Sequence, residues 1–153
     1  MIGFRGCYRY IKEPDLFALE LEALARVREQ WRPQDVHAGT VAAMDAVRSY
    51  YAGELDLVMA VPVELHGTDG QLAGWEQLRR IRPGDPLTYS EFADALGTPR
   101  AVRAAASVCA RNPVALFVPC HRVLRADGSM GGFAWGEDVK RSLLEGEAAG
   151  RAR

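Results

Sequence analysis

A cysteine and a histidine lie side by side at Cys120 and His121, and a carboxylate, Glu147, follows later in the chain. Cysteine is a strong nucleophile only as the thiolate, and with an ordinary pKa of about 8.5 little of it is ionised at neutral pH. Histidine can take the thiol proton, and a carboxylate can orient the imidazole. Because adjacent side chains seldom face each other, we expect a water molecule between thiol and imidazole. A lone Cys-His pair is more often structural, so the surrounding sequence must decide.

The charge of the chain is unevenly distributed. The formal net charge of the 153 residues is -1, but residues 1–76 have 7 Lys and Arg against 12 Asp and Glu, and residues 77–153 have 12 against 8. No acidic residue lies between Ala95 and Ala126, where all the basic residues are arginines: Arg100, Arg103, Arg111, Arg122 and Arg125. Arginine binds phosphate through two parallel hydrogen bonds and stacks on bases. An arginine cluster alone is more often a solvated surface.

Two consecutive helices are expected within this acid-free region and just before it. Residues 88–91 (TYSE) form a capping box, which predicts a helix from Tyr89 that ends at Gly97. Thr98 and Pro99 then predict the N-cap and first residue of a second helix that runs to about residue 111. Two helices joined by a tight glycine turn predict a helix-turn-helix.

The second of these helices is expected to have an arginine face. At helical spacing one face would hold Arg100, Arg103, Ser107 and Arg111. Small residues beside them, among them Ala104 and Ala106, would allow close approach to another surface. Together with the absence of acidic residues, this face indicates nucleic-acid binding.

The remaining elements are predicted from apolar spacing. A helix is expected over 40–51, with Thr40 as N-cap, Gly53 as its end, and Val41, Met44, Val47 and Tyr51 facing inward. An extended connector over 61–65, a helix over 71–81, a buried strand over 114–118 and a last helix that ends near Glu147 follow. In the first 36 residues, residues 2–11 alternate weakly like a strand and residues 15–31 fit either a helix or a strand, so the assignment stays open.

In collinear order, the motifs match one known family. They are YAGEL from residue 51, HGT from 66, PLTYSEFADALG from 86, RAVRAAA from 100, RNP from 111, VPCHRV from 118 and GGFAWG from 131, followed by Lys140 and LLEGE. In these motifs the chain resembles the O6-alkylguanine-DNA alkyltransferases, also called methylated-DNA-protein-cysteine methyltransferases, whose hallmark is Pro-Cys-His-Arg-Val. The resemblance covers about two-thirds of the chain.

The resemblance implies a DNA repair reaction and a role for each matching residue. The protein would flip an alkylated guanine out of duplex DNA and transfer the alkyl group irreversibly from O6 to Cys120, with O4-alkylthymine left open as a second substrate. The catalytic residues would be Cys120, His121, Glu147, Tyr89 and Asn112. The residues implied to bind DNA are Arg103, which would replace the flipped base, with Tyr89, Arg100, Ala104, Ala106, Ser107, Arg111 and Arg122. The substrate pocket would be lined by Val123, Phe133, Ala134, Trp135 and Cys109.

The resemblance also implies an α+β protein of two domains. Residues 1–65 would form a small α/β domain, and residues 66–150 a mainly helical, winged-helix-like domain for DNA binding and alkyl transfer. The first 36 residues lack the family's usual opening, so the first domain is expected to be shortened or rebuilt. Gly70 stands where relatives usually have Phe, and Ala105-Ala106 where they usually have Val-Gly.

We expect a cytoplasmic protein that is a monomer in solution and uses no cofactor. No apolar run is long enough for a membrane span, and the three cysteines cannot all pair in disulfides. Cys7, His37 and His66 lack the spacing of a tetrahedral zinc site, so no metal is expected. Two other functions stay open: a non-catalytic lesion sensor that uses the same helix and pocket, and a cysteine hydrolase that does not bind nucleic acid.

Overall fold

The computed structural model describes the backbone of residues 37–151 and the side chains of residues 42–150. The chain divides into two compact units, residues 1–45 and 46–153; the first nine residues of helix α3 (His37–Ala52) belong to the first unit, and the site described below lies in the second. The helix-or-strand alternatives for the first 36 residues lie outside the described residues. The α/β character expected for residues 1–65 is described only from residue 37 onward, where the elements are the helices α3 and α4 (Leu57–Ala60). The expected division at residues 65 and 66 stays a prediction.

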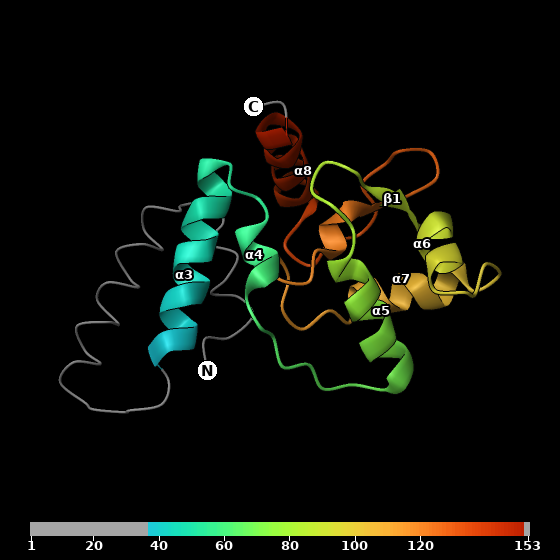
Figure 1. The fold of residues 1–153 in the computed structure, drawn as a ribbon. Helices are drawn as coiled ribbons and strands as arrows, with labels where there is room; N and C mark the ends of the chain where they lie inside the picture. Colours follow the sequence, from blue (N-terminus) through green and yellow to red (C-terminus); the bar gives the residue numbers. More distant parts are fainter. Residues whose placement is uncertain (1–36, 152–153) are drawn as a thin grey trace. The chain divides into compact units, whose positions relative to one another are not determined.

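The described part is mostly helical, with one small parallel sheet. In chain order the elements are α3 (His37–Ala52), α4 (Leu57–Ala60), α5 (Asp69–Arg79), β1 (Leu87–Thr88), α6 (Tyr89–Ala95), α7 (Val102–Ala110), η1 (Cys120–Arg122), β2 (Val123–Leu124) and α8 (Glu137–Arg151). Helices α5, α6 and α7 group together, and β1 lies between α6 and α8 (Figure 1). The mixed helical and parallel-strand class agrees with the α+β prediction.

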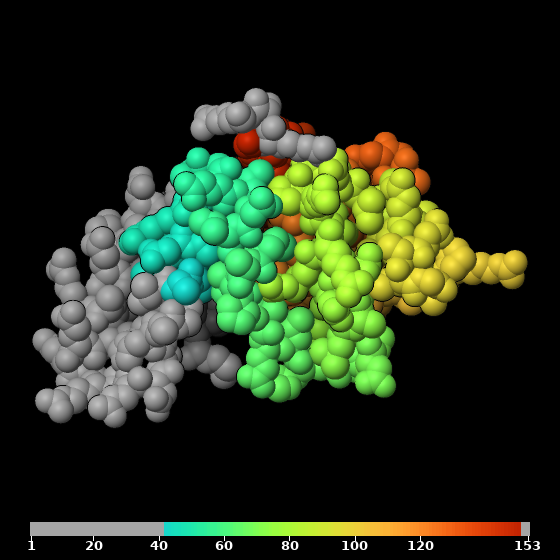
Figure 2. All heavy atoms as spheres, viewed as in Figure 1, coloured from blue at the N-terminus to red at the C-terminus, as the bar shows by residue number. Residues whose placement is uncertain are grey.

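Side chains from α5, α6 and α7 form the core around the strands. Trp75 and Leu78 of α5 pack with Phe92 of α6, Val108 of α7 and Val123 of β2, all less than a tenth exposed. The Trp75 indole N–H donates to the Val108 carbonyl at 3.0 Å, which satisfies its one donor inside the core. On the face seen in Figure 2, atoms of α5 and of the segment 80–100 lie at the surface.

The start of α6 forms as predicted. Thr88 accepts a hydrogen bond from the Glu91 N–H while the Glu91 side chain binds the Thr88 N–H, which is the predicted capping box. Gly97 has a φ of 71° and follows the helix, where the left-handed conformation favours glycine. A second capping box, Thr68 with Gln71, starts α5 two residues before the predicted position.

The predicted start of the next helix is wrong. Thr98 is not its N-cap, because the Ala101 N–H binds the Thr98 carbonyl in a separate turn. Ala101, with φ -103° and ψ 39°, is the residue from which α7 begins. Arg100 therefore precedes the helix and does not share its face.

The predicted strand over 114–118 is also wrong. The Val118 N–H binds the Val114 carbonyl, and Leu116 has a φ of 72°, so the segment turns back on itself. Side chains take the carbonyls that a neighbouring strand would use: Arg79 donates to Phe117 and Asn112 to Val118. The apolar run is buried as a turn, which hydrophobicity alone cannot distinguish from a strand.

Helix α3 is buried most deeply at residues other than those predicted, although Met44 and Val47 of the predicted face are half-buried. It begins at His37, before the expected Thr40, and ends at Gly53, whose φ is 100°. Ala46 and Tyr50 are buried, whereas Tyr51, predicted to face inward, is 42% exposed. Helix α8 also continues to Arg151, past the predicted end near Glu147.

Candidate active site

The small parallel sheet places the Cys-His-Arg turn beside the start of α6. Leu87 pairs with Val123 and Thr88 with Leu124. Strand β1 leads directly into Tyr89, and β2 directly follows the 3-10 turn η1, which carries Cys120, His121 and Arg122. Segments 36 positions apart in the sequence are therefore held together by a pairing of two residues per strand.

Cys120 is 7% exposed and receives a hydrogen bond on its sulfur. The Asn112 amide Nδ2 lies 3.0 Å from Cys120 Sγ and 2.6 Å from the Val118 carbonyl, while Asn112 Oδ1 accepts the Val114 N–H. Asn112 thus joins the end of α7, the 114–118 turn and the thiol.

The groups around Cys120 shift the pKa of its thiol in opposite directions. Burial raises the pKa of Cys120, whereas the Asn112 hydrogen bond and the ammonium group of Lys140 lower it, and burial is the larger effect. The resting residue is a thiol, and a base must take its proton before it can react.

His121 is fully buried and pairs with Glu147 through one ring nitrogen. His121 Nε2 lies 2.9 Å from Glu147 Oε1. Burial lowers the pKa of His121, so the ring is neutral at pH 7, and its Nε2 must carry the hydrogen that the ionised carboxylate accepts. Nδ1 then has a free lone pair, and among the described residues this buried atom has no hydrogen-bond partner.

Glu147 is the fully buried acceptor of several donors. Arg122 binds it through Nε and Nη2, the Gly84 N–H lies 3.3 Å from Oε2, and the Tyr50 hydroxyl donates to Oε1 at 2.7 Å. Burial would raise the pKa of Glu147, but the hydrogen bonds from His121 and Arg122 outweigh it and hold the pKa at about 2. The carboxylate is ionised over the whole physiological range.

The prediction that Arg122 contacts DNA is wrong in this structure. Its side chain is 0% exposed, and its guanidinium binds Glu147 and the Ile81 carbonyl. The sequence places Arg122 beside the catalytic pair but cannot reveal that the turn points it into the core. The positive charge of Arg122 stabilises the buried Glu147 carboxylate.

Two buried polar residues near this centre were not predicted as site residues. Lys140 donates to the carbonyls of Val123 and Met130, and Tyr50 donates to Glu147. Lys140 and Glu147 lie seven residues apart on α8, a spacing that returns to the same helix face and could have indicated Lys140. No local signal indicates Tyr50.

Tyr89 lies at the first residue of α6 and is half-buried. Burial raises its pKa, and the nearby thiols of Cys109 and Cys120 raise it further, so the phenol keeps its proton near the reactive sulfur. A Cβ on Gly131 would lie 3.4 Å from the Tyr89 hydroxyl, so the 131–136 loop passes close to this group.

A row of aromatic rings begins at His121. The Phe133 ring meets the His121 ring edge to face with centroids 6.5 Å apart, and Trp135 meets Phe133 in the same way at 5.4 Å. Trp135 and Val123 are buried, and Ala134 is exposed. Cys109 packs against the core, and burial raises the pKa of its thiol to about 12.

Helix α7 carries the exposed part of the predicted DNA-binding surface. Arg103, Ala104, Ser107 and Arg111 are exposed, Ala106 is half-buried, and Arg100 is exposed in the preceding turn. A groove of about 440 Å³ runs beside Ala104 and Ser107 and reaches Gly70 of α5. A Cβ on Gly70 would have no neighbour within 4 Å, so there is open space at this end of the groove.

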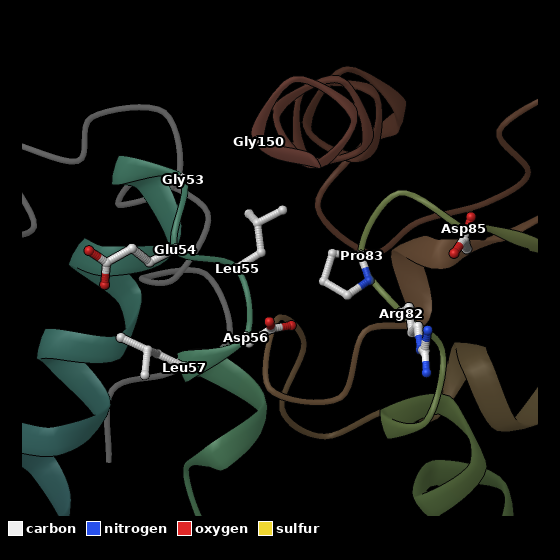
Figure 3. Close-up of a pocket in the computed structure, with 9 residues that line it drawn as sticks. All are labelled: Gly53, Glu54, Leu55, Asp56, Leu57, Arg82, Pro83, Asp85 and Gly150. Atoms are coloured by element: carbon white, nitrogen blue, oxygen red, sulfur yellow. The ribbon is translucent and has the colours of Figure 1, made fainter. Parts of the chain in front are cut away.

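A further pocket of about 510 Å³ lies away from Cys120. It is lined by residues 53–57, Arg82, Pro83, Asp85 and Gly150, and Leu55 lies below α8 in the close-up (Figure 3). It contains none of the predicted site residues. One of its walls is nevertheless the loop whose Gly84 N–H binds Glu147.

Among residues 37–151, no group of three or more His, Cys, Asp and Glu side chains is arranged to hold a metal ion. No helix in that part of the chain combines the length and apolar character needed to cross a membrane.

Comparison with known proteins identifies relatives of the region that carries the site. Residues 69–149 match the family model described as 6-O-methylguanine DNA methyltransferase, DNA binding domain. The chain is 43% identical over 98 residues to the bifunctional transcriptional activator/DNA repair enzyme Ada of Escherichia coli, covering 64% of this chain and 28% of that protein. It is 40% identical over 118 residues to the methylated-DNA--protein-cysteine methyltransferase of Mycobacterium tuberculosis, covering 77% of this chain and 70% of the relative.

Solved structures agree with these sequence relationships. Mycobacterium tuberculosis OGT in complex with DNA superposes with a TM-score of 0.67 at 41% identity, covering 72% of this chain and 68% of that one. The O6-methylguanine-DNA methyltransferase of Pyrococcus kodakaraensis superposes with a TM-score of 0.59 at 32% identity, over 76% and 64% of the two chains.

Proposed function

Because the chain belongs to the methylated-DNA--protein-cysteine methyltransferase family, which repairs DNA by moving an alkyl group onto a protein cysteine, we propose that Cys120 is the acceptor. The observation that carries this proposal is the buried centre itself. Cys120 accepts a hydrogen bond from Asn112, and the neighbouring His121 has one ring nitrogen bonded to Glu147 and the other without a partner among the described residues.

The proposed reaction is a single displacement. The Cys120 proton passes to His121 Nδ1 through a water molecule, and the sulfur attacks the alkyl carbon on O6 of guanine. The carbon–oxygen bond breaks, its electron pair stays on the guanine, and the Tyr89 phenol donates a proton to the leaving base. The product is a thioether on Cys120, which cannot be reversed, so each molecule acts once. Glu147 stabilises the imidazolium as it forms.

The substrate is proposed to be double-stranded DNA that contains O6-alkylguanine. A buried sulfur cannot reach a base inside a duplex, so the base must be flipped out. Helices α6 and α7 would act as a helix-turn-helix, with the exposed Arg103 entering the space that the base leaves. The pocket would be formed around Val123, Phe133, Ala134 and Trp135. The match of residues 69–149 to a DNA-binding domain supports this assignment.

The proposal also includes the domain bounds, the oligomeric state and the location of the protein. The DNA-binding and transfer domain is proposed to be residues 66–150, the protein to act as a monomer, and its location to be the cytoplasm, where a reducing environment keeps a nucleophilic thiol free. Cys109 and Cys120 are both free thiols here. A non-catalytic lesion sensor is not favoured, because Cys120 and its hydrogen-bonding partners are all present.

Transfer of a labelled methyl group tests the proposal. The protein is incubated with duplex DNA that carries O6-[methyl-³H]methylguanine, and protein-bound label is counted. We expect label on the wild type and none on Cys120→Ser. Cys109→Ser, which changes the second thiol near the site, should be labelled like the wild type. Absence of label from the wild type, or its persistence in Cys120→Ser, would overturn the proposal.

A further inference from the structure

One oxygen of Glu147 is crowded with donors. Oε1 lies 2.9 Å from His121 Nε2, 3.0 Å from Arg122 Nε, 2.8 Å from Arg122 Nη2 and 2.7 Å from the Tyr50 hydroxyl. Oε2 receives only Arg122 Nε at 3.1 Å and the Gly84 N–H at 3.3 Å. The oxygen that binds the proposed base is therefore the one held most tightly, and the Tyr50 contact is its shortest.

Tyr50 is placed for this contact by the end of α3. It lies in the last turn of the helix and is 5% exposed, and the Gly53 N–H that ends the helix binds the Tyr50 carbonyl. Burial raises the pKa of the Tyr50 phenol, and the Glu147 carboxylate raises it further, so the hydroxyl remains a donor at any pH at which the protein acts. The contact joins residues 97 positions apart.

We propose that Tyr50 is a positioning residue for alkyl transfer, whose hydroxyl holds Glu147 Oε1 beside His121 Nε2 and shares the negative charge of that oxygen, so that His121 stays neutral with its lone pair on Nδ1. This inference rests on the proposed function, because it assigns Tyr50 to the proton relay of that reaction. Tyr50 touches neither the sulfur nor the substrate and acts only through the carboxylate.

The hydroxyl also sets how strongly Glu147 holds a proton on His121. Two donors share one oxygen, so the Tyr50 hydrogen bond takes part of the negative charge that would otherwise stabilise an imidazolium. The other charged groups facing His121 are Arg122 from η1 and Lys140 from α8, and both disfavour its protonation. Removal of the hydroxyl leaves these two cations in place and makes the carboxylate a stronger partner for His121, so the pKa of His121 rises.

The test compares Tyr50→Phe with Tyr51→Phe. Both changes remove one hydroxyl from adjacent residues of α3, but Tyr51 is 42% exposed. Single-turnover methyl transfer from an O6-methylguanine duplex is measured as a function of pH for both variants and for the wild type. A second readout, the ¹⁵N NMR titration of His121, is made without DNA.

For Tyr50→Phe we expect the acid limb of the rate profile to move up by roughly one pH unit. The rate below the limb would then fall about tenfold, while the plateau at higher pH falls less than about threefold. The NMR titration of His121 should move up by the same amount, and Tyr51→Phe should match the wild type in both readouts. Site-specific 3-fluorotyrosine at position 50 is a stronger donor and should move the His121 titration down.

A purely structural role for Tyr50 predicts a different pattern. Tyr50→Phe would then lower the unfolding temperature and reduce the rate by one factor at every pH, with the His121 titration unchanged, and this pattern would overturn the inference. If the wild type transfers no methyl group, the proposed function fails. The NMR titration would still decide whether Tyr50 controls His121.

Discussion

The amide nitrogen of Asn112 lies 3.0 Å from the sulfur of Cys120 and 2.6 Å from the carbonyl of Val118. One side chain thus stabilises negative charge on the sulfur and fixes the turn that leads to it. Asn112→Asp keeps the shape but replaces the donor with a carboxylate, so we expect the pKa of Cys120 to rise. The transfer rate should fall by about tenfold or more, because hydrogen bonds to charged groups contribute about 1.5–3 kcal/mol.

The rate of iodoacetamide reaction with Cys120 as a function of pH checks this prediction. Asn112→Asp should react more slowly than the wild type at neutral pH, and the midpoint of its reactivity profile should lie higher. An unchanged profile would mean that the Asn112 contact does not act on the sulfur.

Acid should destabilise the protein in two steps. Burial lowers the pKa of His121 in the folded protein below the value of about 6.5 that it has in the unfolded chain. The contribution of neutral His121 to the free energy of unfolding is therefore complete above about pH 6.5, and it is lost as the pH falls toward the pKa of the folded protein. Glu147 contributes fully above its unfolded pKa of about 4.5 and loses its contribution as pH falls toward about 2. In both ranges the unfolded state binds more protons, so stability decreases with acidification.

Urea unfolding between pH 8 and pH 3 measures this dependence. In a plot of the free energy of unfolding against pH, Glu147→Gln should reduce the slope below about pH 4.5. Glu145→Gln, at an exposed position of the same helix, should leave the plot unchanged. Equal curves for Glu147→Gln and the wild type would contradict the assignment.

Substitution of Arg122 should mainly reduce stability, whereas substitution of Arg103 should mainly reduce DNA binding. Arg122→Ala leaves Glu147 buried without its main cation, and breaking a buried pair costs about 3–5 kcal/mol. Arg103→Ala, at an exposed position of α7, should weaken DNA binding by about tenfold with unfolding nearly unchanged. Chemical denaturation and fluorescence anisotropy with a duplex measure the two effects. If Arg122→Ala folded normally and lost only DNA affinity, Arg122 would act on DNA and not through the buried contact with Glu147.

Gly74 should not tolerate a methyl group. A Cβ there would lie 2.5 Å from Val108 Cγ1, so Gly74→Ala would push α5 and α7 apart and cost about 1–3 kcal/mol. Gly146 in α8 has no neighbour within 4 Å of a built Cβ, so Gly146→Ala should be neutral or slightly stabilising. Thermal unfolding distinguishes the two. The double variant Gly74→Ala/Val108→Ala should recover part of the stability that Gly74→Ala loses, because the smaller side chain makes room for the methyl group. If the double variant recovers none of it, the contact with Val108 is not the cause of the loss.

The sequence correctly predicts helix ends that depend on residues only a few positions away along the chain. The capping box at Thr88 and the left-handed glycines Gly53 and Gly97 act within a few residues, so the sequence indicates them correctly. The strand expected over 114–118 fails because an apolar run shows burial but not backbone direction. The carbonyls there are bound by Arg79 and Asn112, which arrive from other elements.

The same distinction applies to the site. Cys120, His121 and Asn112 are found through motif residues, and the structure brings them together. The burial of Arg122 and the contact of Tyr50 with Glu147 depend on how α3 and α8 pack, and sequence spacing does not contain that information. In α3, an error of one residue in the inward face selects Tyr51 instead of Tyr50.

Intact-protein mass spectrometry after incubation with an equimolar O6-methylguanine duplex tests the central claim most directly. We predict that the mass rises by one methyl group per chain, that peptide mapping places it on Cys120 and on neither Cys7 nor Cys109, and that a second portion of duplex adds nothing. An unmodified protein, a methyl group on another residue, or repeated turnover would contradict the account.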